Sequence, residues 1–200
     1  QQAYNYPDWG FSFLYHNPHN SILGENYGLH GHYNFYFFKR NLLFRVGSGI
    51  SYSSNPFDLE TNFKNNAYGS DILNSTYFLI NYNKQNIFKG FGLQAGLTLI
   101  HYSNANVRAP NSSTNTMAFN IGLHYELDQK ESPSLFKKSS FEAYSEPIKF
   151  NLMLRGGVNE SDFIGLGQHP FWIVSTFVDK RISYLSSLQF GTEVFFAKFL

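Results

Sequence analysis

The chain contains no cysteine among its 200 residues, which excludes a disulfide framework and a thiolate metal site. It also has almost no net charge, because 15 Lys and Arg stand against 14 Asp and Glu and give a formal charge of +1. A chain so balanced has no global basic field to attract nucleic acid. Nucleic acid is therefore not an expected partner.

Long apolar runs are missing as well. The mean hydropathy is -0.30, and no segment reaches the run of about 18 apolar residues that a membrane-spanning helix needs. Aromatic residues, in contrast, are abundant, with 22 Phe and 14 Tyr. They favour strands and collect where hydrocarbon meets water. A transmembrane β-barrel stays open, since it hides its hydrophobicity in every second residue.

Alternation of period two runs through most of the chain, and no segment carries a sustained helical stripe. In 87–101 the odd positions are mostly aliphatic or aromatic and the even ones mostly small or polar, and 115–126 and 147–158 repeat the pattern. It is typical of barrel strands with an apolar outside and a polar inside. The pattern predicts strands at 9–16, 30–38, 42–53, 71–83, 87–102, 115–126, 147–158, 171–180 and 187–196.

A soluble sandwich or a lipocalin-like barrel would show the same alternation with its apolar face turned inward. Strand length separates the two, because several segments here reach 10–15 residues. A usual strand has about 5–6 residues, and a tilted membrane strand needs about 9–11. We therefore predict an all-β fold, an antiparallel transmembrane β-barrel of about eight to ten strands.

Connection lengths support this prediction, because outer-membrane barrels join strands by short turns at one end and longer loops at the other. The links near 39–41 and 83–86 are short, whereas 17–29, 54–70, 103–114 and 159–170 are long; the exception is 127–146, long and charged. Nine strands is an odd count, and single-chain bacterial barrels have even numbers. We expect 1–200 to form one barrel domain that continues beyond Leu200, and the polar start at Gln1 is compatible with a processed chain.

His101 and Ser103 stand two residues apart at the end of one predicted strand, so the side chains of a base and a nucleophile share a face. That face is the lipid-facing row. If the next strand pairs as a hairpin about 103–114, Asn115 lies opposite His101, with Cβ atoms about 4.5–5.5 Å apart. Polar groups are costly in hydrocarbon, so the site is expected at the interface. The arrangement indicates an esterase that works on lipid.

The segment His101-Tyr-Ser103-Asn104-Ala, followed by Pro110-Asn111, resembles the signature of the PagL-type lipid A 3-O-deacylases and of related acyloxyacyl-hydrolase-like proteins. These hydrolases are β-barrel serine esterases of the Gram-negative outer membrane. The resemblance is tight over 101–115 and looser over the flanking strands, and 127–200 reach beyond the minimal eight-stranded enzyme. It implies that Ser103 is the nucleophile, His101 the general base and Asn104 part of the oxyanion hole.

The resemblance also implies a bacterial outer-membrane location, with lipid A and membrane lipids of the outer leaflet as partners. No cofactor or metal is expected, and a homodimer is left open. His30 and His32 share one strand face, but two ligands without a third make a weak metal site, and polar lumen or rim residues are the better interpretation.

Two residues depart from the family pattern. Asn115 stands where the minimal enzymes have a glutamate; its amide oxygen can accept the Nδ1-H of His101 but cannot offset the charge of the imidazolium. Asp71, at the start of the preceding strand, is the alternative acid, whereas Glu126 lies about 36 Å farther along and on the opposite face. Asn106 stands where glycine is expected; asparagine tolerates positive φ, so Asn106 remains a second oxyanion candidate.

Two hypotheses of function follow. In the first, His101 takes the proton of Ser103, Oγ attacks an acyl ester of lipid A, and donors around Asn104 and Asn106 stabilise the oxyanion. In the second, the chain is a non-catalytic outer-membrane barrel: a degenerate relative that has lost turnover, a small channel or a structural anchor.

Overall fold

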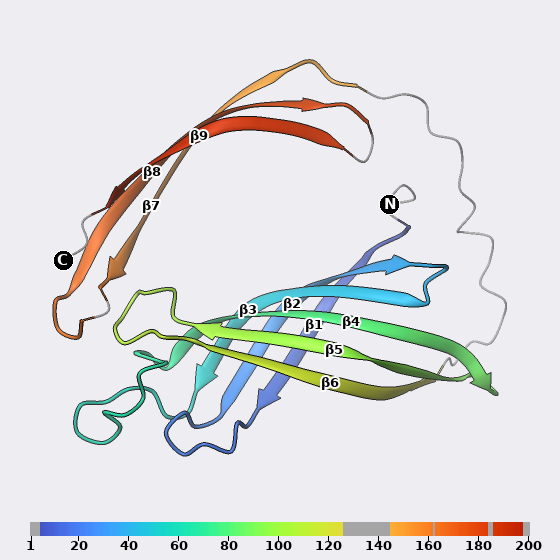
Figure 1. Ribbon diagram of the computed structural model, residues 1–200, viewed down its shortest axis with the longest axis horizontal. Coiled ribbons are helices and arrows are strands. Elements are labelled where there is room, and N and C mark those ends of the chain that lie inside the picture. The colour runs from blue at the N-terminus through green and yellow to red at the C-terminus, as the bar shows by residue number, and fades with distance from the viewer. Residues whose placement is uncertain (1–4, 126–144, 162, 184–185, 198–200) are drawn as a thin grey trace. The chain divides into compact units, whose positions relative to one another are not determined.

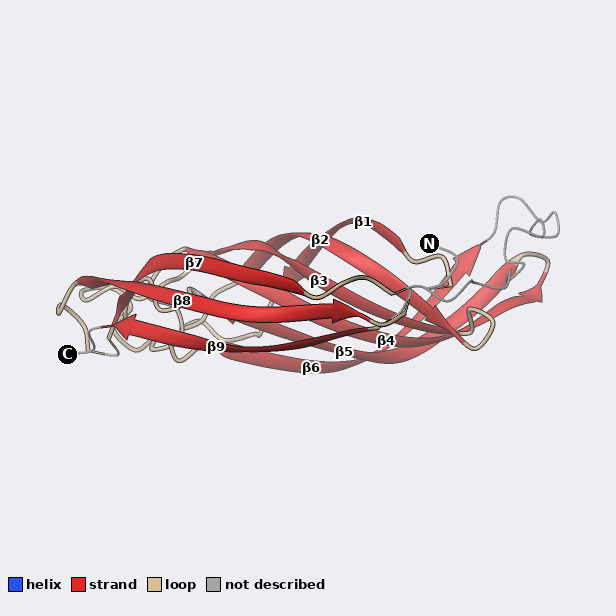
Figure 2. Cartoon of the chain, turned by 90° about the horizontal axis from the view of Figure 1, so that it is seen from above, coloured by secondary structure: helices blue, strands red, loops and turns tan. Residues whose placement is uncertain are grey.

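The computed structural model describes residues 5–125, 145–161, 163–183 and 186–197 (Figures 1 and 2). Every regular element in these ranges is a β-strand, which confirms the all-β prediction. Each of the nine predicted strands overlaps one observed strand. The strands are β1 (Asp8–His16), β2 (Asn26–Phe37), β3 (Leu42–Ser53), β4 (Ile72–Phe88), β5 (Phe91–Ser103), β6 (Thr114–Tyr125), β7 (Lys149–Glu160), β8 (Gln168–Arg181) and β9 (Ser187–Ala197).

All strand pairs are antiparallel and join neighbours in sequence. They form a six-stranded sheet, β1-β2-β3-β4-β5-β6, and a three-stranded sheet, β7-β8-β9. The two sheets belong to two compact units of the chain. The ladders among the described strands do not close into a ring; the antiparallel order is consistent with the predicted barrel. No helix in the described ranges has the length and apolarity to cross a membrane.

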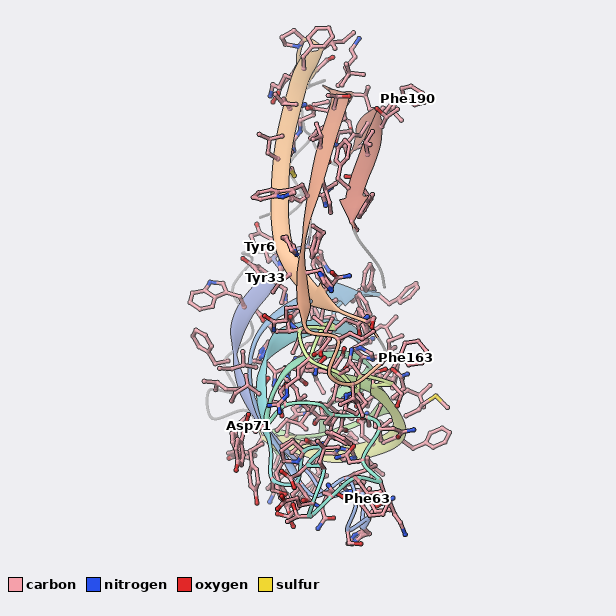
Figure 3. The ribbon with its side chains drawn as sticks, turned by 90° about the vertical axis from the view of Figure 1, so that its left-hand side faces the viewer. Tyr6, Tyr33, Phe63, Asp71, Phe163 and Phe190 are labelled. Atoms are coloured by element: carbon pink, nitrogen blue, oxygen red, sulfur yellow. The ribbon has the colours of Figure 1, made fainter. Side chains whose placement is uncertain are left out.

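The first sheet has one face on which apolar side chains are exposed, here called the apolar face. It carries the odd positions of β1, β2, β5 and β6 and the even positions of β3 and β4. Tyr33, labelled in Figure 3, is 57% exposed there, and Phe119 is 87% exposed. This confirms the predicted alternation, because the apolar row is the one left uncovered. Its other exposed members include Trp9, Phe11, Phe13, Leu29, Ile50, Phe78, Ile80, Leu97, Leu99, Met117, Ile121 and Leu123.

The opposite face of this sheet is polar and buried. His30 and Ser75 are fully buried and their Nε2 and Oγ atoms lie 2.8 Å apart. His32 Nδ1 lies 3.2 Å from Ser12 Oγ, so one ring nitrogen of each histidine contacts a hydroxyl. Buried groups of this kind are stable only when they are hydrogen-bonded. Their apolar neighbours form the core at the loop end of the sheet: Ala67, Tyr68, Leu73, Tyr77, Ile100 and Tyr102.

Long connections and short turns lie at opposite ends of the first sheet. The connections 17–25, 54–71 and 104–113 leave one end, and the turns at 38–41 and 89–90 close the other. The predicted link at 83–86 is wrong, because β4 continues through a register shift after Lys84 as far as Phe88. Lys89 and Gly90 make the turn with φ of 45° and 87°, the positive values that a two-residue hairpin turn requires.

The second sheet repeats the two-faced pattern. Phe150, Leu152 and Leu154 are exposed on one face, together with Phe190, which Figure 3 labels. On the other face Arg155 forms an ion pair with Glu193. This confirms the predicted apolar row of 148–154. Of the predicted long connection 127–146, residues 127–144 lie outside the described ranges, as do 198–200 at the end of the chain.

Candidate active site

The site lies on the apolar face, where β5 ends. His101 and Ser103 have the parity of Leu97 and Leu99, so their side chains follow the exposed apolar row of their strand. Within β5 the row is apolar from Phe91 to Leu99 and becomes polar at His101. In the ladders Ser48, Thr76, His101 and Asn115 stand directly opposite one another across β3, β4, β5 and β6.

His101 is fixed by its neighbour on β6. Asn115 is its direct partner in the ladder, as the hairpin argument predicts, and Nδ1 of His101 lies 2.8 Å from Oδ1 of Asn115. An amide oxygen can only accept, so Nδ1 carries the proton in this arrangement. Nε2 is then the basic nitrogen of the ring, which is the tautomer that a general base for a serine needs.

Ser103 is held by the loop that follows it. Its Oγ-H donates to Oδ1 of Asn111 over 3.2 Å, and Oγ accepts from Nδ2 of Asn111 over 2.9 Å. The backbone N-H of Ala105 also donates to Oγ, over 3.0 Å. The sequence analysis named Asn111 only as part of the family signature and missed this contact. The available signal was an amide side chain directly after Pro110 in a loop, a residue type that bonds nearby backbone.

The hydrogen bonds of Ser103 and His101 go to different partners, and none of them joins Ser103 to His101 within the described residues. Residues two apart in a strand are separated by about 6.6 Å along the chain. A turn of the Ser103 side chain away from Asn111 is therefore required before proton transfer. Catalytic hydrogen bonds are often made only when substrate is bound.

The loop after Ser103 holds the two predicted oxyanion residues. The side chain of Asn104 is buried, with the residue 5% exposed, and its backbone N-H donates to Oδ1 of Asn111 over 3.0 Å. Ala105 and Asn106 both have φ of 56°. The positive φ expected of Asn106 is thus present, since asparagine adopts it at low cost.

Of the two other carboxyl groups considered, the structure describes Asp71, which is not a ladder partner of His101. Asp71, labelled in Figure 3, lies directly before β4, five residues from Thr76, the ladder partner of His101. At about 3.3 Å per residue this separation is roughly 16 Å. The backbone carbonyl of Asp71 accepts from Ser53 instead. Glu126 lies outside the described residues.

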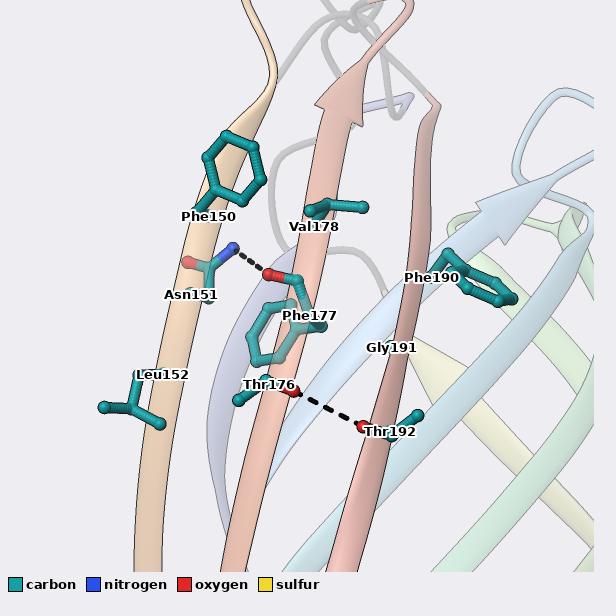
Figure 4. Close-up of a pocket in the computed structure, with 9 residues that line it drawn as sticks. All are labelled: Phe150, Asn151, Leu152, Thr176, Phe177, Val178, Phe190, Gly191 and Thr192. Atoms are coloured by element: carbon teal, nitrogen blue, oxygen red, sulfur yellow. Dashed lines mark hydrogen bonds between the residues drawn. The ribbon is translucent and has the colours of Figure 1, made fainter.

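A groove crosses β7, β8 and β9, with a volume of about 540 Å³ (Figure 4). Phe150, Phe177 and Phe190 contribute rings to it, and a hydrogen bond of 3.3 Å joins Thr176 to Thr192. None of the nine residues that line it is titratable. The groove therefore offers no acid or base.

The fold and the site together define a β-sheet protein that carries a serine and a histidine on an exposed apolar surface. A family model described as lipid A 3-O-deacylase (PagL) matches residues 1–124, which include all six strands of the first sheet except the last residue of β6. The chain belongs to this family, as the resemblance over 101–115 indicates, and membership implies a lipid A deacylase, a hydrolase. No curated protein and no solved structure matched the chain.

Proposed function

We propose that the protein is an outer-membrane esterase that removes the 3-O-linked acyl chain of lipid A, with Ser103 as nucleophile and His101 as general base. The observation that carries the proposal is the bond from His101 Nδ1 to Asn115 Oδ1 on the apolar face. It leaves Nε2 basic on a surface suited to lipid. Family membership supplies the substrate class.

Two features favour the outer leaflet as the place of reaction. Ser103 ends β5 at the same end of the sheet as the long connections 17–25, 54–71 and 104–113. In outer-membrane barrels the long loops are extracellular and the short turns periplasmic. Tyr15, Tyr27 and Tyr52 lie at this end of the apolar face, and tyrosine is enriched where the bilayer meets water.

The reaction is a two-step acyl transfer. The proton of Ser103 passes to Nε2 of His101 as Oγ bonds to the ester carbonyl carbon, and the carbonyl electron pair moves onto oxygen. When the tetrahedral intermediate collapses, the bond between the carbonyl carbon and the lipid A oxygen breaks. That oxygen takes the proton from His101. Water then attacks the acyl-enzyme by the same route and releases the fatty acid. Asn115 holds the ring but adds no charge, so the imidazolium is less stabilised than beside a carboxylate.

The test is mass spectrometry of lipid A after incubation of lipopolysaccharide with the purified full chain. Wild type should remove one acyl chain, and Ser103→Ala should lower the rate by at least about 10³-fold. Tyr82→Phe, which removes another exposed hydroxyl from the same face at a distance from the site, is the matched control and should keep the rate. Unchanged lipid A with folded wild type would favour the non-catalytic barrel. Full activity of Ser103→Ala would reject the nucleophile.

A further inference from the structure

The neighbouring strand β4 presents a second pair of polar side chains to the site. Asn74 is the direct ladder partner of Ser103, and Thr76 is that of His101. Direct partners in an antiparallel sheet have Cβ atoms about 4.5–5.5 Å apart. Asn74 is exposed and has the parity of the apolar face, whose neighbouring residues in β4 and β3 are Ile72 and Ile50. A side-chain amide in an apolar environment costs free energy unless it has a hydrogen-bond partner.

The amide of Asn74 is oriented by its own strand. The hydroxyl of Thr76 donates to Oδ1 of Asn74 over 3.5 Å, at the outer limit of a hydrogen bond. Nδ2 of Asn74 donates no hydrogen bond to any residue that the structure describes. The Nδ2-H of Asn74 is therefore an exposed hydrogen-bond donor beside the nucleophile, and its acceptor is not among the described residues.

The loop donors are occupied in this structure. The Asn104 N-H is donated to Oδ1 of Asn111, and the Ala105 N-H to Oγ of Ser103. On the edge of β5 away from β6, Ser103 is paired with β4. A carbonyl attacked by Ser103 can turn its oxygen toward Asn74 on this strand.

We propose that Asn74 is a further catalytic residue, which donates Nδ2-H to the carbonyl oxygen of the substrate and to the oxyanion that forms on it. The inference rests on the proposed function, since it needs Ser103 as nucleophile. As Oγ bonds to the carbonyl carbon and its proton passes to His101, the electron pair that moves onto the oxygen is met by the Asn74 N-H. Asn74 exchanges no proton. Such a donor acts most strongly where water is excluded.

The test uses the full chain in detergent micelles with two probes, an alkyl fluorophosphonate and 4-nitrophenyl laurate. The phosphonate bonds covalently to an active serine, and its P=O oxygen takes the place of the oxyanion. Asn74→Ala should lower kcat for the laurate by about 10²-fold with KM within about twofold, and should slow the phosphonylation of Ser103 by a similar factor. Asn74→Asp, of the same shape but without the donor, should lose at least as much.

Tyr82→Phe is the matched control, because it removes an exposed hydroxyl from the same face of the same strand, well away from Ser103; it should keep both rates. Far-UV circular dichroism checks that each variant keeps its sheet. If both Asn74 variants keep kcat and labelling within about threefold of wild type, the role of Asn74 is overturned while the proposed function stands. If wild type neither hydrolyses the laurate nor is labelled at Ser103, the proposed function fails, and the role of Asn74 with it.

Discussion

His101 and Asn115 face each other across the β5–β6 ladder, with Nδ1 of the imidazole 2.8 Å from Oδ1 of the amide. The geometry is that of a histidine and its orienting acid, but the partner is neutral. Asn115 therefore supplies the correct tautomer without the charge, and the two contributions can be measured separately in this protein.

Asn115→Asp should raise kcat for lipid A deacylation, because a carboxylate stabilises the imidazolium that forms as Ser103 loses its proton. In the serine protease triad the reverse exchange costs about 10⁴-fold, partly through the wrong tautomer, so the gain here should be smaller, about 10- to 10³-fold. Asn115→Ala should lower kcat, since the ring loses its partner. Initial rates of acyl release measure both, and a drop in Asn115→Asp would contradict the assignment.

Asn111 should matter as a positioning residue, since its amide contacts both Oγ of Ser103 and the N-H of Asn104. Asn111→Ala removes the bonds that hold Oγ of Ser103 in the resting position, but it also frees the loop that carries Asn104. A misplacement of about 1 Å can cost about 10²-fold in rate, so the net rate should fall. Asn111→Asp keeps the acceptor for Asn104 and removes the donor to Ser103. The rate of fluorophosphonate labelling separates the two effects: a rate equal to wild type in both variants would leave Asn111 with a purely structural role.

Glu25, in the connection before β2, should make the loop end of the first sheet sensitive to acid. Hydrogen bonds from the hydroxyls of Tyr27 (2.5 Å) and Tyr15 (2.9 Å) lower the pKa of the Glu25 carboxyl. A lowered folded-state pKa stabilises the fold at pH values above the usual carboxyl pKa, and this stabilisation is lost as the pH falls through the lowered value. The hydrogen-exchange protection factors of residues 17–25 should fall below about pH 4 in wild type. In Glu25→Gln the acid-induced change should be absent; an equal change would contradict the role of Glu25.

Gly90 should be intolerant of a side chain, because its φ of 87° lies in the left-handed region. A residue with a Cβ pays roughly 1–2 kcal/mol there, so Gly90→Ala should lower the free energy of unfolding by about that amount. Gly31→Ala is the control, since Gly31 has no positive φ and a Cβ there would meet nothing within 4 Å. Urea unfolding in lipid vesicles measures both, and equal stabilities would contradict the assignment of the turn.

Strand positions and pairing could be predicted because they follow from period-two alternation. The pairing of His101 with Asn115 needed only the parity of two strands and a hairpin between them. The β4–β5 turn was misplaced, because the polar run 83–86 has the composition of a turn although β4 continues through it as a shifted ladder. The contacts of Asn111 and the isolation of Ser103 from His101 depend on loop conformation and side-chain rotamers, which carry no periodic pattern. The chemical roles of these residues stay predictions until variants are measured.

The hydrogen bonds of Ser103 with Asn111 bear on selectivity within a membrane. A serine on an outward surface of a membrane protein meets the esters of every lipid around it, whether or not they are substrates. While the Ser103 hydroxyl donates its proton to Asn111, no base accepts that proton. Under the proposed mechanism the hydroxyl reaches the imidazole only after a bound ligand displaces this contact, so the resting state does not attack the surrounding lipids.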